Sequence, residues 1–244
     1  MMALPRTVWG EFPDVFIHTD EQIVKRHPDY LAAKTGDAAA AGRLVAATFN
    51  EIQVALLQHQ VGKNRPILVS VHAYETAGVN AIPEALADEL SDRLEWRIDE
   101  NIIQTNVVGH TGADGYTRLA HPAHFDGEVI TGADYVVVDD FIGQGGTLAN
   151  LRGHLETHGA RVIAAMVLTG KPYSAKLRLD SIQLHELRMK HGDQLESWWR
   201  ERFGYGFDCL TQSEARYLTR SSDAHLIRTR IVAAEQTRNR SSSA

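Results

Sequence analysis

The segment that most constrains the fold is an apolar run that ends in two adjacent carboxylates and a glycine-rich turn. It reads Tyr135-Val-Val-Val-Asp-Asp-Phe-Ile-Gly-Gln-Gly-Gly-Thr147. An uninterrupted run of β-branched residues is typical of a strand that is buried on both faces. The residues that follow, Leu148 to Leu155, have the spacing of a helix. The sequence therefore predicts a turn at the carboxyl end of a strand, where ligands bind in open α/β sheets.

The residue types in this turn are suited to a phosphorylated sugar. Glycines at positions 143, 145 and 146 let backbone amides approach and surround a phosphate. Thr147 can cap the next helix and donate its hydroxyl group to the same anion. Asp139 and Asp140 are poor phosphate ligands, but they accept hydrogen bonds from ribose hydroxyl groups or bind a divalent cation through water. The pattern predicts a ribose phosphate site.

The segment resembles the phosphoribosyl pyrophosphate (PRPP) motif of type I phosphoribosyltransferases. The resemblance implies an open, mostly parallel α/β sheet flanked by helices, with a small hood. It also implies transfer of a 5-phosphoribosyl group from PRPP to a nitrogen of a nucleobase-like acceptor, with Mg²⁺ and release of pyrophosphate. Asp139 and Asp140 would then hold the ribose and the metal. The 5-phosphate would be held by Gly143, Gln144, Gly145, Gly146 and Thr147.

The chain departs from the family at Gly143 and Gln144, just before the glycine pair. Many members carry a hydroxyl group or a catalytic acid there. The departure leaves phosphate binding to backbone amides and Thr147, and it removes the general base that some purine-specific members use. Two further interpretations stay open: a PRPP-sensing regulatory or accessory protein without transfer activity, and a fold that holds a different phosphorylated sugar.

Other nucleotide-binding folds also place acidic or glycine-rich segments after a strand. P-loop NTPases require Gly-x-x-x-x-Gly-Lys-Ser/Thr, which this sequence lacks. A dinucleotide fold requires Gly-x-Gly-x-x-Gly, and the turn at residue 143 lacks the third glycine. Both alternatives are disfavoured.

A second strand, loop and helix is predicted from residues 66–72, 73–80 and about 81–94, with Pro83 in the first turn of the helix. In the resembled family, the loop after the first core strand holds pyrophosphate. Glu75 would act there through Mg²⁺, because a bare carboxylate repels pyrophosphate. An ordinary strand-to-helix connection is the alternative. The residues at this position are Tyr74, Glu75, Thr76, Ala77 and Gly78.

A strand is expected at residues 101–108, followed by a long mobile loop at 109–127. Type I phosphoribosyltransferases close a flexible loop over the reacting centre at this point. The resemblance makes Arg118 the candidate catalytic cation for the departing pyrophosphate, beside Asp139 and Asp140. A solvated surface arginine is the alternative. The loop histidines are interpreted as lid or surface residues rather than zinc ligands, because Pro122 interrupts the helix that would align them and no cysteine is nearby.

A third strand is predicted at residues 161–169. In purine-using members of the family, a lysine just beyond this strand contacts the exocyclic oxygen of the base. Lys171 occupies the corresponding place here. A loop lysine without a role in base recognition is the alternative, and Tyr173 is interpreted as a packing residue more readily than as a stacking one.

Composition limits the partners. With a net charge of −6 and a pI near 6.0, we expect neither nucleic acid nor a membrane surface as a partner. One cysteine excludes an internal disulfide, and no apolar run approaches the length of a membrane span. We therefore expect a cytoplasmic protein that binds small molecules, as a homodimer.

The domain organisation is predicted from helix and strand signals. Residues 1–37 form an N-terminal segment or hood, residues 38–180 the α/β core, residues 181–236 a helical C-terminal appendage, and residues 237–244 a disordered tail. A helix that Asp37 opens is expected to run toward His59. The appendage is expected to pack on one edge of the core, with a dimer or partner surface as the alternative.

Overall fold

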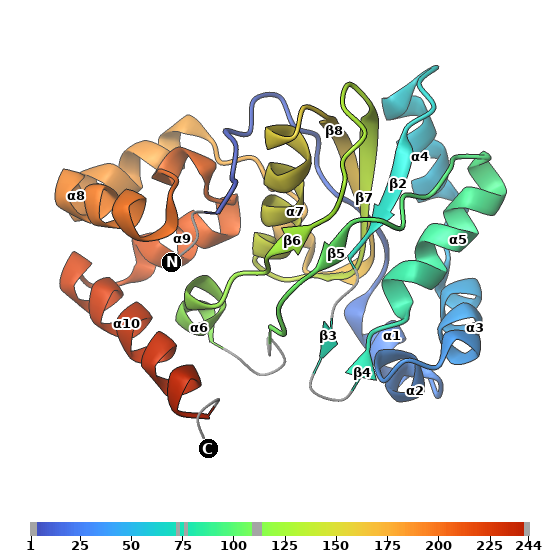
Figure 1. The fold of residues 1–244 in the computed structure, drawn as a ribbon, viewed down its shortest axis with the longest axis horizontal. Helices are drawn as coiled ribbons and strands as arrows, with labels where there is room; N and C mark the ends of the chain where they lie inside the picture. The colour runs from blue at the N-terminus through green and yellow to red at the C-terminus, as the bar shows by residue number, and fades with distance from the viewer. Residues whose placement is uncertain (1–3, 72–73, 76–77, 109–113, 242–244) are drawn as a thin grey trace.

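The computed structural model describes residues 4–71, 74–75, 78–108 and 114–241. Within these residues, the central sheet has four strands in the order β1-β8-β7-β2, and each neighbouring pair is parallel (Figure 1). This topology confirms the expected open parallel sheet flanked by helices. The strands are β1 (Phe16–Thr19), β2 (Ile67–Ser70), β7 (Asp134–Ile142) and β8 (Arg161–Gly170).

Strand β7 is buried on both faces, as its apolar run predicts. Val136 and Val138 face one hydrophobic cluster, whereas Tyr135 and Val137 face another on the opposite side of the sheet. Alternation along a strand sends successive side chains to opposite faces, so an all-apolar run is stable only when both faces are covered.

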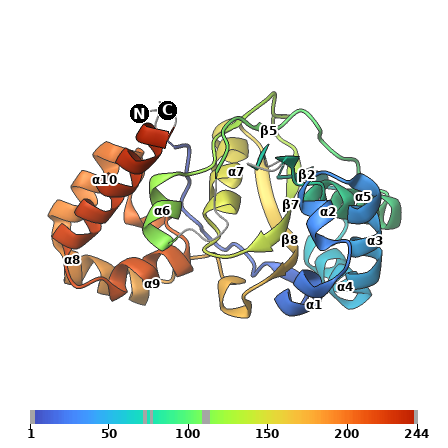
Figure 2. The ribbon, with the colours of Figure 1, turned by 90° about the horizontal axis from the view of Figure 1, so that it is seen from below.

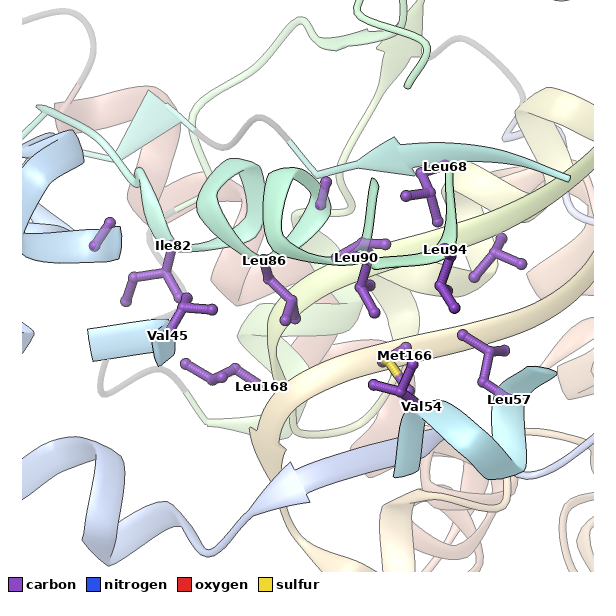
Figure 3. Packing of buried hydrophobic residues seen from close by; sticks show 14 of the residues in the cluster. Val45, Val54, Leu57, Leu68, Ile82, Leu86, Leu90, Leu94, Met166 and Leu168 are labelled. Carbon is purple, nitrogen blue, oxygen red and sulfur yellow. The ribbon is translucent and has the colours of Figure 1, made fainter. Parts of the chain in front are cut away.

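One face of the sheet is covered by the N-terminal helices and by α5. Figure 3 shows Leu86 and Leu90 of α5 near Met166 and Leu168 of β8, with Val54 of α4 beside them. Pro83 stands in the first turn of α5, as expected. These helices are α1 (Glu21–Arg26), α2 (Tyr30–Lys34), α3 (Ala38–Thr48), α4 (Glu51–Val61) and α5 (Ile82–Leu94).

The single helix expected from Asp37 toward His59 is two helices, so that prediction was wrong. Asp37 caps α3 by accepting a hydrogen bond from the amide of Ala40. Asn50 then caps α4 through its side-chain oxygen, and its own amide donates to Nδ1 of the buried His18 at 2.9 Å. A capping residue with extended backbone interrupts one helix and begins the next.

The other face of the sheet carries α7 (Gly146–Thr157), the helix that follows the glycine-rich turn. Leu148, Leu151 and Leu155 of α7 pack with Trp9 and Phe12 of the N-terminal segment. The N-terminal segment also supplies β1, an edge strand of the central sheet. Its first 37 residues are therefore integrated with the core rather than set apart as a hood.

The strand expected at residues 101–108 is much shorter and lies outside the central sheet. Only β5 (Ile103–Gln104) is a strand, and it pairs in antiparallel fashion with β6 (Phe125–Asp126). The loop that follows contains a helix, α6 (Gly115–Ala120), which Asp114 caps at the amide of Thr117. Residues 109–113 lie outside the described residues.

The C-terminal appendage is helical, as expected, and packs beside α6 and α7 on the side of the sheet opposite α1–α5 (Figure 2). Trp199, Phe203 and Phe207 centre its hydrophobic cluster, which also includes Leu4 and Leu119. Helix α10 continues to residue 241, into the segment expected to be disordered. The helices are α8 (Ser181–Phe203), α9 (Gln212–Arg220) and α10 (Ala224–Ser241).

Among the helices of the described segments, none combines the length and the apolar composition that crossing a membrane requires.

Candidate functional site

A cavity of about 470 Å³ lies at the carboxyl ends of β7 and β8. Its walls come from the N-terminal helices, the turn between β7 and α7, the α6 segment and helix α9. Most of the residues that the sequence singled out meet there, although they come from distant parts of the chain. Those lining the cavity are Arg118, Asp139, Asp140, Gly143, Gln144, Gly145, Gly146, Thr147 and Lys171.

The glycine-rich turn leaves the start of α7 open to a ligand. Gly145 is the N-cap residue with φ of 80°, a conformation that favours glycine. Among the described residues, no side chain caps this helix. The first-turn amides are therefore available to an anion, which the positive end of the helix also favours.

Arg118 lies directly over Gly143. A Cβ atom added at Gly143 would stand 2.9 Å from Nη1 of Arg118 and 3.3 Å from a ring carbon of Phe141. Any side chain at residue 143 would have to displace this guanidinium. The glycine at this position therefore leaves room for the end of the Arg118 side chain.

The two carboxylates lie at the base of the cavity. Asp139 is buried, and Oδ1 of its side chain accepts a hydrogen bond from the amide of Asp140 at 2.8 Å. Lys34 of α2 donates to Oδ2 of Asp140 at 3.1 Å. Burial, and then the neighbouring charge of Asp140, raise the pKa of Asp139 well above its usual range. A cation bound at this pair would favour the ionised form.

Lys171 follows β8 and reaches toward the N-terminal helices. Its ammonium nitrogen lies 2.8 Å from Oε2 of Glu21. The other carboxylate oxygen, Oε1, accepts a hydrogen bond from Lys25. The pair raises the pKa of Lys171 and, through hydrogen bonds from Lys171 and Lys25, lowers the pKa of Glu21. Sequence reasoning missed Glu21, because no pattern links it to the end of a strand that lies 150 residues later.

The turn that was predicted to hold pyrophosphate forms a short antiparallel hairpin of β3 (Tyr74–Glu75) and β4 (Gly78–Val79). Thr76 and Ala77 lie outside the described residues. Val71 and Asn80, on either side of the hairpin, line the cavity. The residues before and after the hairpin therefore lie at the edge of the cavity.

Helix α9 of the appendage is the part of the site that sequence reasoning missed. Thr211, its N-cap residue, donates its hydroxyl hydrogen to the carbonyl oxygen of Gln144 at 2.6 Å. Glu214 forms a buried ion pair with Arg6, whose Nη2 also approaches the carbonyl oxygen of Gly146 at 3.4 Å. The capping box Thr211-x-x-Glu214 signals the start of a helix. It does not indicate that this helix packs against the turn.

The loop histidines do not gather around a metal in the described part of the chain. His121 ends α6, with Nε2 at 3.1 Å from the carbonyl oxygen of Ala234 in α10. No group of three histidine, cysteine, aspartate or glutamate side chains among the described residues is arranged to hold a metal ion. A divalent cation at Asp139 and Asp140 would need further ligands from substrate and water.

Comparison with known proteins identifies a domain around this cavity. Residues 80–187 match the family model described as phosphoribosyl transferase domain. Protein TraN of Escherichia coli is 42% identical over 229 residues, which is 94% of this chain and 51% of that protein. An uncharacterized protein of Haemophilus influenzae is 38% identical over 151 residues, covering 62% of this chain and 34% of that protein. The chain thus spans about half, or less, of the length of these curated relatives.

Solved structures with similar folds include two adenine phosphoribosyltransferases. The enzyme from Thermoanaerobacter pseudethanolicus is 13% identical, with a TM-score of 0.32, over 50% of this chain and 79% of that one. A second adenine phosphoribosyltransferase is also 13% identical, with a TM-score of 0.36, over 57% of this chain and 74% of that one.

The matched domain runs from the start of α5 through β7, the glycine-rich turn, α7 and β8. It therefore contains the whole motif at residues 135–147 and the strand after it. The carboxylates and the open end of α7 belong to this same segment. The chain carries a phosphoribosyl transferase domain at residues 80–187.

Proposed function

We propose that the protein transfers the 5-phosphoribosyl group of PRPP to a nitrogen of a nucleobase-like acceptor and releases pyrophosphate. One observation carries the proposal. The carboxylates of Asp139 and Asp140, the uncapped start of α7 and the guanidinium of Arg118 all line one cavity. They match the three chemical parts of the substrate, which are ribose hydroxyl groups, a terminal phosphate and a departing anion.

In this scheme, the turn holds the 5-phosphate and the carboxylates hold the sugar. Amides of residues 145–147, the hydroxyl group of Thr147 and the positive end of α7 bind the phosphate. Asp139 and Asp140 accept hydrogen bonds from the ribose hydroxyl groups. Their charge also stabilises the positive character that the sugar develops as the bond to pyrophosphate breaks. Holding both partners in one geometry accounts for much of the expected rate gain.

Mg²⁺ fits the donors present at this site. The ion prefers oxygen ligands, retains several waters and commonly binds proteins through one or two carboxylates together with substrate phosphates. Asp139 and Asp140 supply such carboxylates. When bound, the ion would neutralise charge on the pyrophosphate. We assign Tyr74, Glu75 and Gly78 of the hairpin, with Thr76 and Ala77 between them, to the pyrophosphate.

Arg118 and Lys171 complete the proposed site from opposite sides. Arg118 lies over the turn and would contact the leaving pyrophosphate, for which its planar guanidinium is suited. Lys171 would contact the acceptor. It is now paired with Glu21 and 46% exposed, so it can exchange that partner for an oxygen of the acceptor without crossing the core.

A PRPP-sensing protein without transfer activity is the second candidate. The observation that favours it is the absence of an acid or hydroxyl group at Gly143 and Gln144, where many family members carry one. Such a protein would bind PRPP and change its oligomeric state or its affinity for a partner, and no acceptor would be consumed. We keep a cytoplasmic location and a homodimer as expectations for either candidate.

Phosphorus NMR separates the two candidates. The protein is incubated with Mg²⁺, PRPP and a pool of purine and pyrimidine bases, and the signals of pyrophosphate and of a new sugar phosphate are followed. Transfer predicts that both signals grow only when a base is present. The folded Asp139→Asn/Asp140→Asn variant should show neither. PRPP that persists unchanged with every base, while still binding the protein, would replace transfer with the sensor.

A further inference from the structure

Helix α9 presents one face to the cavity. Ser213, Arg216, Tyr217 and Arg220 line it, and their spacing places them on the same side of the helix. The opposite side, with Leu218, is buried in the appendage. The appendage therefore forms part of the wall of the binding site as well as packing against the core.

The cavity wall carries a flat pair of side chains where α9 meets the end of β8. The guanidinium carbon of Arg216 lies 5.0 Å from the centre of the Tyr173 ring, and Nη2 of Arg216 donates to the hydroxyl oxygen of Ser213 at 2.9 Å. Tyr173 is 61% exposed and lines the cavity just beyond Lys171. An exposed tyrosine held by an arginine offers a flat surface to an aromatic ligand.

The carboxylates that line the cavity already have cationic partners. Glu214 pairs with Arg6, and Asp140 pairs with Lys34. Glu21 is shared between two lysines. Among the described residues that line the cavity, only Asp139 is a carboxylate without such a partner, and it lies buried beside Asp140 at the base.

Arg216 and Arg220 differ from these paired cations. Within the described part of the chain, neither guanidinium forms an ion pair with a carboxylate, although Arg216 keeps its contacts with Tyr173 and Ser213. The 5-phosphate has its own partners in the amides at the start of α7. That turn contacts α9 at Thr211, at the other end of the helix from Arg220. The charge of Arg220 thus lies away from this turn, and that of Arg216 lies beside Tyr173.

We infer that the acceptor is a planar ring that carries a negatively charged group, with the ring against Tyr173 and the charge on Arg216 and Arg220. The inference rests on the proposed function, because it assigns the second substrate of the same site. A carboxylate suits the fork of a guanidinium, which donates two parallel hydrogen bonds. Neutral bases would leave both arginines without an anionic partner in the complex.

Three nucleoside 5′-monophosphates, the products of such a transfer, test this inference by calorimetric titration. Uridine and orotidine 5′-monophosphate differ only in a ring carboxylate, and adenosine 5′-monophosphate carries a purine ring without charge. A charged hydrogen bond of this kind should make the orotidine nucleotide bind about tenfold more tightly than the uridine nucleotide. Ribose 5-phosphate, which has no base, reports separately on binding to the glycine-rich turn.

A double variant in α9 and a control variant test whether α9 causes the preference for the carboxylated ring. Arg216→Gln/Arg220→Gln should abolish the preference for the carboxylated ring and leave the affinity for ribose 5-phosphate unchanged. Arg65→Gln removes an exposed arginine that does not line the cavity, and it should change neither value. Thermal unfolding of each variant checks that the fold is retained.

The outcomes distinguish a failure of the acceptor assignment from a failure of the proposed function. If ribose 5-phosphate and PRPP bind but the nucleotide with the carboxylated ring binds no more tightly than those with uncharged rings, the acceptor assignment is overturned. It is also overturned if the double variant loses affinity for ribose 5-phosphate, because the arginines then serve the phosphate. If neither PRPP nor ribose 5-phosphate binds the wild-type protein, the proposed function itself fails.

Discussion

At the scale of the single residue, ionisation of Asp139 is expected to lower the folding stability and to strengthen ligand binding. Its pKa is raised by burial and by Asp140, so the folded state holds this proton more tightly than the unfolded state. Its contribution to stability therefore falls as pH rises above the ordinary carboxyl range toward the raised pKa. Binding of PRPP with Mg²⁺ should strengthen over the same rise, because the ionised carboxylate is the form that binds.

Asp139→Asn should separate these two effects. The amide is neutral at every pH, so we expect an unchanged or higher melting temperature near neutral pH, together with PRPP affinity weakened at least tenfold, about 1.4 kcal/mol. Thermal unfolding and calorimetric titration measure the two quantities on the same sample. A lower melting temperature with unchanged PRPP affinity would contradict this account of Asp139.

Gly143→Ser tests the position where the turn departs from the phosphoribosyltransferase motif that it resembles. The new side chain restores a hydroxyl group, but its Cβ would meet Arg118 at 2.9 Å. We expect weaker PRPP binding because the guanidinium is displaced. In a variant that already lacks Arg118, through Arg118→Ala, the same substitution should have a much smaller effect, since the two positions are coupled. Gly42→Ala, at a glycine with open space around it, is the control.

Residue types alone predicted which side chains of the turn line the cavity. Adjacent carboxylates before a glycine-rich turn indicated a ribose phosphate site, and the cavity brings Asp139, Asp140 and Thr147 together with Arg118. The close approach of Arg118 to Gly143 was not predictable. It depends on a guanidinium from a segment that the sequence indicated only as a long loop.

At the scale of the element, α9 contacts the glycine-rich turn through its N-cap residue, Thr211. The hydroxyl group of Thr211 accepts a hydrogen bond from the amide of Glu214 at 3.0 Å and donates to the carbonyl oxygen of Gln144 at 2.6 Å. The first contact caps the helix, and the second holds the turn. A single side chain thereby joins the appendage to the binding site.

Thr211→Val removes both contacts, whereas Thr211→Ser keeps them. We expect Thr211→Val to lose about 1 kcal/mol of unfolding free energy with the helix cap and, in addition, to bind ribose 5-phosphate several-fold more weakly. Thr211→Ser should stay close to wild type in both. Urea unfolding and calorimetry provide the two readouts. Lost stability with full ribose 5-phosphate affinity would show that Thr211 only caps its helix.

Elements with strong local signals were predicted well, and those that depend on distant partners were not. Strands β2, β7 and β8 are continuous apolar runs that lie where the sequence placed them. The segment at residues 101–108 has a similar apolar character, yet only two of its residues are in a strand, because their partner is β6 rather than the central sheet. Pairing of this kind leaves no trace in local periodicity.

At the scale of the whole molecule, a buried ion pair connects three distant segments. Arg6 of the N-terminal segment binds Glu214 of α9 through two hydrogen bonds, and its Nε donates to Oδ1 of Asn150 in α7 at 2.6 Å. Both charged side chains are almost fully buried. These contacts therefore join the N-terminal segment, α7 and the appendage beside the cavity.

Glu214→Gln should destabilise the protein by about 3 kcal/mol, because it leaves the charge of Arg6 buried without a counter-charge. Arg6→Met/Glu214→Leu removes both charges and should recover much of that loss. Chemical unfolding of the three proteins measures the effect. Equal stability of wild type and Glu214→Gln would mean that the ion pair does not join these segments energetically.

The position of the appendage was not predictable from its own sequence. The sequence predicted a helical appendage, and the helices α8, α9 and α10 confirm its helical character. Their place beside α6 depends on contacts such as the 2.6 Å hydrogen bond between the hydroxyl groups of Tyr116 and Ser221, more than a hundred residues apart. Only the folded chain shows that the appendage lines the ligand cavity.

The central claim is that the cavity binds PRPP through its carboxylates and the open end of α7. Calorimetric titration of PRPP with Mg²⁺ into the wild-type protein and into Asp139→Asn/Asp140→Asn tests it most directly. We predict saturable binding at one site per chain, lost in the double variant while its melting temperature is retained. Wild-type protein that binds no PRPP, or a folded double variant that binds it equally well, would contradict the account.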